Sequence, residues 1–314
     1  MRTLDKDEIL ARLDLERAEA LLRQGFIAYS AGRAQLPPVQ HFAFAEANGD
    51  CCVKSGYVEG ESLFAVKVSS GFYDNSKRGL PSNQGLVLCF CARTGAPLAL
   101  LRDEGWLTAW RTALAGRLAA RVLAPGRVEA IGVVGTGLQA RLQLRALQAA
   151  TPCRDVWVWG RSETELAVFV AEFEPLGYRL RTTLDAEPLA RACQLIVTCT
   201  PSTRPILQAG WLTPGTHVTA VGADAAGKQE LAAELVAGAD RVVVDSIAQC
   251  AAYGEVSHAL AAGLLVRESL AELGQVLAGE RPGRQSEDEI TLADLTGLAV
   301  QDVQIAKCVL EAQD

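Results

Sequence analysis

Two patterns of apolar residues divide the chain along its length. Residues 13–31 carry apolar side chains at the three-to-four-residue spacing of an amphipathic helix, and Gly32 follows as a residue that can end it. Residues 34–101 hold short apolar runs broken by Gly, Pro, Asn and Asp, which is typical of strands joined by turns. Residues 105–123 return to a long helical pattern rich in Ala and Leu. The N-terminal part is therefore predicted to be β-rich, with a helix on either side.

From residue 128 onward, apolar strand patterns alternate with helical patterns. The predicted strands are VEAIGVV, DVWVWG, RLRTTL, LIVTCT, THVTAVG and RVVVDS, and the helices between the first four are LQARLQLRALQAA, SETELAVFVAEF and AEPLARAC. This alternation predicts βαβ units and a parallel sheet, and runs such as LIVTC favour a sheet covered on both faces. We predict an α/β protein with a doubly wound domain over 119–297 and a β-rich domain over 1–118, to which a C-terminal helix over 298–314 returns.

Composition narrows the classes of function. The 314 residues are 49% hydrophobic and 21% charged, with a net charge of −7, so a general nucleic-acid or anionic-membrane surface is not expected. The first residues are charged and amphipathic, unlike a signal peptide, and no stretch reaches the roughly 18 apolar residues of a membrane span. Nine Cys without a CxxC pair and three His without an HExxH motif indicate reduced thiols and no metal site. We expect a soluble, cytoplasmic protein.

A glycine-rich turn follows the first strand of the alternating region. Gly135, Thr136, Gly137, Leu138, Gln139 and Ala140 fit the pattern G-x-G-x-x-A between a predicted strand and a predicted helix. The first Gly permits the tight turn, the second lets the backbone approach a pyrophosphate, and the Ala allows close helix–strand packing. The helix N-terminus then offers free N–H groups to the phosphates. The motif predicts a dinucleotide site of the Rossmann type; the alternative is a bare structural turn.

The end of the next strand indicates which dinucleotide is bound. Sites that prefer NAD usually carry an acid there, bonded to the ribose 2′-hydroxyl. Here the strand is followed by Gly160, Arg161 and Ser162, and the first acid is Glu163. A guanidinium and a hydroxyl suit a 2′-phosphate, so NADP(H) is expected in preference to NAD(H). The alternative is a solvated Arg161 beside a loosely bound NAD.

Three charged residues outside this turn are candidates for chemistry. Asp224 follows the strand THVTAVG at the edge where open α/β sheets bind ligands. The alternative is a helix cap, the most frequent role of a lone Asp at such a position. A Gly-containing loop and Lys228 then lead into a predicted helix. Lys67 lies inside an apolar strand, where an unpaired ammonium would be costly. Arg111 lies on an apolar helix face. Each cation either reaches solvent or awaits an anionic ligand.

Several separated motifs together resemble one known family. In order, they are Gly79-Leu80-Pro81-Ser82, TGAPLALL, LTAWRTALAG, VGTGLQA, VGADAAGKQEL and DLTGLAVQD. They resemble the ornithine cyclodeaminase/mu-crystallin family over nearly the whole chain. The resemblance implies a homodimer whose subunits have a β-rich domain for substrate and dimer contact and a Rossmann domain. Members include ornithine cyclodeaminases, alanine dehydrogenases and NADPH-dependent ketimine reductases.

The resemblance also implies roles for single residues. Lys67 and Arg111 would hold the substrate carboxylate, and Asp224 would be the acid/base group at the amine or imine nitrogen. The sequence WGRS resembles that of NADP-using members. Further cofactor contacts implied by the family are Ser82, Arg111, Thr200, Val221, Gly222, Ala223, Asp224, Lys228 and Thr296.

Two departures from the family pattern bear on the substrate. A carboxylate-binding Arg usually follows the proline-rich turn, where this chain has Val39, Gln40 and His41. Cyclodeaminases carry a Glu on the strand before Lys67, whereas the nearest charge here is Lys54, which would repel the side-chain ammonium of ornithine.

We therefore predict an NADPH-dependent imine reductase or amino-acid dehydrogenase acting on a small α-amino or cyclic imino acid. The alternatives are an ornithine cyclodeaminase and a non-catalytic, mu-crystallin-like protein that binds NADP or another ligand.

Overall fold

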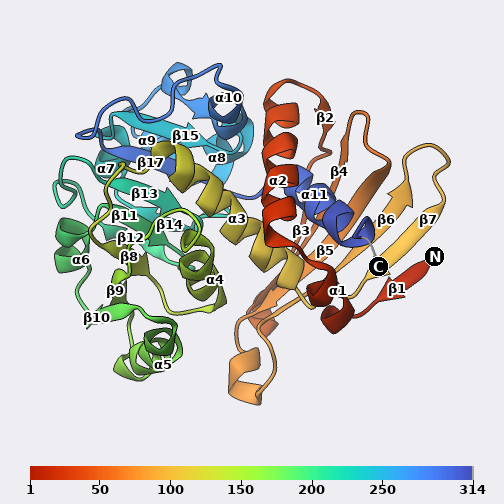
Figure 1. The fold of residues 1–314 in the computed structure, drawn as a ribbon, viewed down its shortest axis with the longest axis horizontal. Coiled ribbons are helices and arrows are strands. Elements are labelled where there is room, and N and C mark those ends of the chain that lie inside the picture. The colour runs from red at the N-terminus through yellow and green to blue at the C-terminus, as the bar shows by residue number, and fades with distance from the viewer. Residues whose placement is uncertain (313–314) are drawn as a thin grey trace. The chain divides into compact units, whose positions relative to one another are not determined.

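The chain folds into two compact units. The computed structural model describes residues 1–312; the first unit contains residues 1–111 and the chain from residue 298, and the second contains residues 112–297 (Figure 1). The boundary falls inside helix α3 (Trp106–Leu123). The helix expected over 298–314 is α11 (Ala299–Leu310), and residues 313–314 of that expectation lie outside the described part.

The first unit is built on one β-sheet. Among the described residues the strand order is β1–β7–β6–β5–β4–β2, with β3 also paired to β4, and every pairing is antiparallel except that of β1 with β7. The elements are β1 (Arg2–Leu4), α1 (Lys6–Arg12), α2 (Leu15–Ser30), β2 (Ala34–Gln35), β3 (Gln40–Phe44), a 3₁₀ turn (Ala45–Ala47), β4 (Gly49–Val58), β5 (Leu63–Phe72), a 3₁₀ turn (Asn75–Arg78), β6 (Asn83–Cys91) and β7 (Pro97–Leu101). The predicted helix and β-rich region are confirmed.

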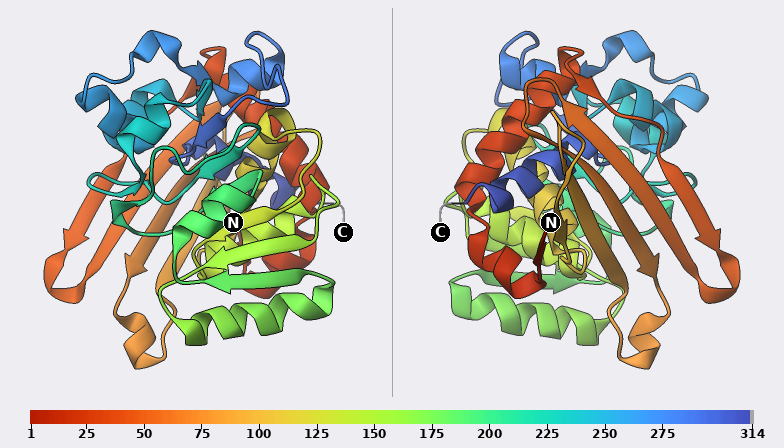
Figure 2. Two further views of the ribbon diagram at one scale, coloured as in Figure 1. Left: turned by 90° about the vertical axis from the view of Figure 1, so that its left-hand side faces the viewer. Right: turned by 90° about the vertical axis from the view of Figure 1, so that its right-hand side faces the viewer.

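One face of this sheet forms the core of the first unit. Residues of β4 and β5 alternate between buried and half-buried, as the period of a strand requires. Helix α11 packs on α2 and against both strands, and Figures 1 and 2 show the two helices together over the sheet. Gly56 allows this approach, because a Cβ there would lie 3.1 Å from the Cβ of Ala299.

The second unit contains an all-parallel sheet. Within residues 112–297 the order is β10–β9–β8–β11–β13–β17–β15–β16, and β12 pairs with β14 separately. Its strands are β8 (Ile131–Val134), β9 (Asp155–Trp159), β10 (Arg179–Thr183), β11 (Leu195–Thr198), β12 (Thr203–Leu207), β13 (His217–Ala220), β14 (Gln229–Leu231), β15 (Arg241–Val244), β16 (Ala271–Glu272) and β17 (Thr291–Asp294).

Helices cover both faces of the parallel sheet. They are α4 (Leu138–Leu147), α5 (Glu163–Phe173), α6 (Ala186–Ala192), α7 (Ala233–Ala237), α8 (Ile247–Tyr253), α9 (Glu255–Ala261) and α10 (Leu273–Ala278), with 3₁₀ turns at Glu174–Leu176 and Arg267–Ser269. Two separate cores result: Val133 packs with residues of α4 and α5, whereas its neighbour Val134 packs with residues of α6 to α9. This confirms the predicted doubly wound α/β fold with a sheet covered on both faces.

Two details differ from the sequence prediction. Lys228 leads into the short strand β14 and not directly into a helix, because residues 229–231 pair with β12 before α7 begins. The parallel sheet also gains β17 from the segment just before α11, and this strand lies between β13 and β15.

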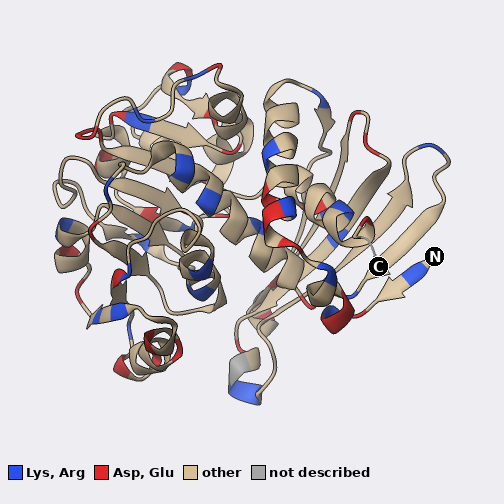
Figure 3. Ribbon diagram, viewed as in Figure 1, with Lys and Arg blue, Asp and Glu red and all other residues tan. Residues whose placement is uncertain are grey.

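The described helices show no membrane-spanning candidate, since none is both long enough and apolar enough to cross a bilayer. Basic and acidic residues are interspersed over the elements of each unit (Figure 3).

Candidate active site

The turn after β8 is shaped for a phosphate group. Gly135 has a φ of +123°, and a Cβ there would lie 3.1 Å from the carbonyl oxygen of Cys199. Gly137 caps α4 without a side-chain hydrogen bond, and a Cβ there would meet nothing within 4 Å. A ligand can therefore approach the first N–H groups of α4, where the positive end of the helix dipole favours a phosphate. Ala140 is fully buried, as close helix–strand packing requires.

A pocket lies where β8, β9 and β11 end. These strands are neighbours in the sheet, and β8 is the strand from which the order runs both ways, the position at which open α/β sheets bind ligands. Leu138 and Gln139 follow the turn as the first residues of α4, and the Nε2 atom of Gln139 is buried without a hydrogen-bond acceptor in the described chain. The pocket is lined by Gly135, Thr136, Gly137, Trp159, Gly160, Arg161, Cys199, Thr200, Pro201, Ser202 and Ile206.

Arg161 and Ser162, which follow β9, have different roles in the structure. Arg161 lines the pocket and is exposed, and no hydrogen bond or ion pair engages its side chain within residues 1–312. The hydroxyl of Ser162 accepts a hydrogen bond from the N–H of Glu165 at 3.4 Å and thereby caps α5. The guanidinium is thus available to an anion at the mouth of the pocket, while the hydroxyl already serves the helix.

Asp224 and Lys228 form an ion pair on the loop after β13. The Nζ atom of Lys228 donates to Oδ1 of Asp224 at 2.6 Å, and the carboxyl side chain is 53% exposed. Asp224 is therefore accessible to a ligand and carries a neighbouring proton donor. It does not act as a cap for α7, whose N-cap is Ala232.

The remaining predicted cofactor contacts are mostly buried. Val221 and Ala223 lie at the end of β13 and are 7% and 2% exposed. The hydroxyl of Thr296, just after β17, donates to Oδ1 of Asp245 at 3.0 Å. Ser82 belongs to the first unit, where its carbonyl accepts from the N–H of Phe72. Their placement leaves their cofactor role a prediction.

Lys67 and Arg111 share one carboxylate in the first unit. The Nζ atom of Lys67 donates to Oδ1 of Asp302 at 2.9 Å, and Nε of Arg111 lies 3.4 Å from the same oxygen. Nη1 of Arg111 donates to Gln301 at 3.0 Å. The side chains of Lys67, Arg111 and Asp302 are 2%, 8% and 4% exposed, so neither cation reaches solvent as the alternative interpretation of the sequence supposed.

Burial and the mutual charges shift the pKa values of this cluster. Burial lowers the pKa of Lys67 to about 8; Asp302 opposes this shift, and Arg111 and Lys54 reinforce it. Burial alone would raise the pKa of Asp302, but Lys67 and Arg111 hold it below its usual value. The guanidinium has five N–H donors; Nε faces Asp302 at 3.4 Å and Nη1 donates to Gln301, so the cluster retains donors for a ligand carboxylate.

Lys54 adds a third cation to this face of the sheet. It lies directly opposite Lys67 in the β4–β5 register and is 9% exposed. By contrast, Gln40 and His41, which stand near the usual position of a family Arg, lie on β3 and are exposed.

Sequence reasoning missed two residues of functional interest. Asp302 lies on the buried face of α11, and its signal was an acid in an otherwise apolar helix that begins just after DLTGL. Glu230 lies on β14, is fully buried, and accepts hydrogen bonds from the loops after β11 and β13. Its signal was weaker: a Glu after Lys228 and Gln229 that directly precedes the apolar residues of LAA.

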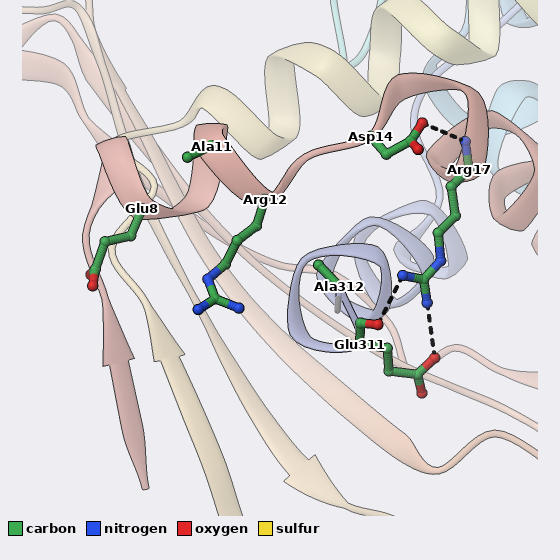
Figure 4. A pocket seen from close by; sticks show the side chains of 7 residues that line it. All are labelled: Glu8, Ala11, Arg12, Asp14, Arg17, Glu311 and Ala312. Carbon is green, nitrogen blue, oxygen red and sulfur yellow. Dashed lines mark hydrogen bonds and ion pairs between the residues drawn. The ribbon is translucent and has the colours of Figure 1, made fainter. Parts of the chain in front are cut away.

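A separate polar hollow lies on the surface of the first unit (Figure 4). Arg17 spans it, donating to the carbonyl of Glu311 at 2.9 Å and pairing with its carboxylate at 3.3 Å. Both side chains are more than one-third exposed, so this pair contributes little stability. The hollow is lined by Glu8, Ala11, Arg12, Asp14, Arg17, Glu311 and Ala312.

Comparison with known proteins agrees with the fold. Residues 2–314 match the model of the ornithine cyclodeaminase/mu-crystallin family. An archaeal alanine dehydrogenase, solved as a dimer with bound NAD, superposes with a TM-score of 0.92 at 33% identity, covering 99% of this chain and 95% of that one.

Two further solved structures are similar over the whole chain. The Δ1-pyrroline-2-carboxylate reductase of Thermococcus litoralis, in complex with NADH and L-proline, has a TM-score of 0.93 at 29% identity, covering 99% of this chain and 97% of that one. The iminosuccinate reductase of Paracoccus denitrificans, in complex with NAD⁺, has a TM-score of 0.89 at 32% identity, covering 99% and 96%.

Proposed function

The chain belongs to the ornithine cyclodeaminase/mu-crystallin family, and on this basis we propose that it is a nicotinamide-dependent oxidoreductase acting on the Cα–N bond of a small α-amino or cyclic imino acid. The observation that carries the proposal is the buried pair of cations, Lys67 and Arg111, which share a single acceptor oxygen of Asp302 and keep donors for a carboxylate. The glycine-rich turn after β8, which lets a phosphate group approach the N-terminus of α4, supports the assignment of a nicotinamide dinucleotide cofactor.

Each polar residue has one task in this scheme. Lys67 and Arg111 bind the substrate carboxylate and thereby orient Cα. Asp224 gives a proton to the nitrogen as the imine is reduced and takes it back in the reverse direction, and Lys228 holds its carboxyl group in place. The nicotinamide, when bound, supplies or accepts the hydride at Cα.

The cofactor is NADP(H) in preference to NAD(H). Arg161 lines the cofactor pocket at the end of β9, exposed and outside any ion pair of residues 1–312, where it can pair with a 2′-phosphate. The three similar structures hold NAD or NADH. The proposed NADP preference therefore rests on Arg161 after β9 of this chain and not on the similar structures.

The substrate lacks a distal ammonium. Lys54 faces Lys67 across the β4–β5 pair, and a second positive charge would disfavour ornithine there. Imines of small α-keto acids and the cyclic imines Δ1-pyrroline-2-carboxylate and Δ1-piperideine-2-carboxylate meet this requirement. The similar structures are named for activity on Δ1-pyrroline-2-carboxylate, iminosuccinate and alanine, which supports the same class of substrate.

The protein acts as a homodimer through the outer face of the first unit's sheet. This face is apolar and only half-buried in the single chain, with the rings of Phe64 and Phe90 stacked at 5.1 Å between β5 and β6. Leu98 on β7 is 38% exposed. Covering such a face with a second copy removes apolar area from water, and the similar alanine dehydrogenase is a dimer.

The proposal is tested by following loss of NADPH with each cyclic imine, and with pyruvate or oxaloacetate plus ammonia, and by repeating each assay with NADH. Turnover of an imine supports it. Formation of proline from ornithine with NAD would instead establish a cyclodeaminase. Cofactor binding without turnover of any of these compounds would favour the non-catalytic binding protein.

A further inference from the structure

One loop that lines the cofactor pocket is joined to the loop after the neighbouring strand through one buried side chain. The loop after β11 begins at Cys199 and contributes Thr200 to the pocket, and the loop after β13 carries Gly222 and Asp224. The strands are paired, with Thr198 opposite Ala220, so both loops leave the same edge of the sheet.

Glu230 accepts four hydrogen bonds across this gap. Its Oε1 accepts from the backbone N–H of Thr200 at 2.6 Å and from the Thr200 hydroxyl at 2.8 Å. Its Oε2 accepts from the hydroxyl of Thr198 at 2.7 Å and from the N–H of Gly222 at 2.8 Å. Each carboxylate oxygen thus has two donors, which is the full capacity of an ionised carboxyl group.

The local backbone is built around this carboxylate. A Cβ at residue 222 would collide with the carbonyl oxygen of Thr200 and with the Glu230 carboxyl group, so only Gly fits there. The backbone N–H groups of Glu230 and Leu231 in turn donate to Glu255 at 2.7 and 3.0 Å. These two hydrogen bonds fix the backbone of β14 that carries Glu230. The Glu230 carboxylate in turn binds both loops.

We infer that Glu230 is a positioning residue for the cofactor site: it locks the loop of Thr200 to the loop of Gly222 and so fixes the wall of the pocket. This inference rests on the proposed cofactor site. The Glu230 side chain is fully buried, so it touches neither cofactor nor substrate and acts through the loops it joins.

The four hydrogen bonds by which Glu230 joins the two loops depend on the charge of its carboxyl group. A protonated carboxyl group carries its own donor and loses acceptor capacity, so one of the four bonds must break. Burial raises the pKa of Glu230 to about 7, and the four hydrogen bonds oppose that rise. Glu255, Asp294 and Cys199 are the titratable groups that interact with it electrostatically. The hydrogen bonds between Glu230 and the two loops should therefore weaken as the pH falls through about 7.

The test is an equilibrium titration of the full-length protein with NADPH and NADH, followed by cofactor fluorescence. In Glu230→Gln the amide group faces N–H donors, and we expect the Kd for the cofactor to rise about tenfold or more. Glu289→Gln is the matched control: this acid pairs with Arg241 at 3.0 Å, at the opposite ends of the strands. The control should lose the ion pair with Arg241 and keep the wild-type Kd.

The pH dependence separates positioning from a general loss of stability. The wild-type Kd should rise between pH 8 and pH 6, and this rise should be absent in Glu230→Gln. If that variant does not fold, Thr198→Val removes a single hydroxyl donor without changing shape, and we expect about a threefold rise in Kd.

Wild-type affinity in Glu230→Gln, or in Thr198→Val when the first variant fails to fold, would overturn the inference. A wild-type protein that binds neither cofactor would overturn the proposed function instead, so the two failures are distinguishable.

Discussion

Lys67 and Asp302 form a buried ion pair, 2.9 Å from Nζ to Oδ1, between residues 235 positions apart in the sequence. One partner lies on β5 and the other in the first turn of α11. The pair therefore fastens the C-terminal helix to the sheet of the first unit. The hydrogen bond to Asp302 also orients Lys67. The negative charge of Asp302 favours the ammonium form of Lys67, which burial disfavours.

Breaking this pair at one end should destabilise the protein strongly. Asp302→Asn leaves the buried Lys67 and Arg111 without a counter-charge, and we expect a loss of about 3–5 kcal/mol in the free energy of unfolding. Replacing both partners, as in Lys67→Met with Asp302→Asn, should cost less than the sum of the two single losses, because Arg111 alone then remains without its counter-charge; activity should not return. Urea unfolding of the two single variants and the double variant gives the coupling energy. Additive losses in the three variants would contradict a direct pair.

Substrate affinity should fall in alkaline solution because Lys67 releases its proton. Its pKa is lowered to about 8, so the ammonium that attracts a carboxylate is present below pH 8 and disappears above it. The KM for the imino acid should therefore rise above pH 8. The effect on stability has the opposite sign: the unfolded chain keeps this proton to a higher pH, so stability from this group rises between about 8 and 10.5.

Lys67→Arg is the control for this titration. A guanidinium keeps its proton throughout the range, so the increase in KM above pH 8 should vanish even if the variant is slower overall. An identical pH profile in Lys67→Arg would mean that another group titrates.

The parallel sheet could be predicted where strands alternate with helices, because each strand is a short apolar run between turn residues. The signal failed for β17: its four residues, TLAD, are fully buried on both faces and merge with the pattern that leads into α11. Its position between β13 and β15 depends on long-range pairing. The same holds for β14, where three residues form a strand only because β12 lies beside them.

The site could be predicted where a local motif requires a particular residue. Gly135 and Gly137 are specified by the turn itself, and Lys67 by its cost in an apolar strand. The partners of such residues were harder to find, since Asp302 meets Lys67 only after α11 packs on the sheet. Likewise, nothing local in the sequence links Glu230 to Thr200 and Gly222. The one available signal was an acid directly before a short apolar run.

Removing the acid at residue 224 should separate catalysis from cofactor binding. In Asp224→Asn the amide oxygen can still accept from Lys228, so the loop should keep its conformation. The variant cannot donate or accept the proton at the substrate nitrogen, and kcat should fall by about 100-fold or more. The Kd for NADPH should be unchanged in fluorescence titration. A variant that retains full turnover would exclude Asp224 as the acid/base group.

Cofactor preference should depend on the exposed guanidinium after β9. Arg161→Ala removes a cation that lines the cofactor pocket while leaving the cap of α5, which is made by Ser162, intact. Loss of a charge-assisted bond to a 2′-phosphate should weaken NADPH about 10- to 100-fold and leave NADH almost unaffected, because the 2′-hydroxyl of NADH carries no charge to match. The measurement is kcat/KM for both cofactors with one imine. Arg161→Lys serves as the control, since it keeps the charge but loses the bidentate geometry and should fall between wild type and Ala. Equal losses for NADPH and NADH in Arg161→Ala would assign Arg161 to the shared part of the dinucleotide and remove the basis for an NADP preference.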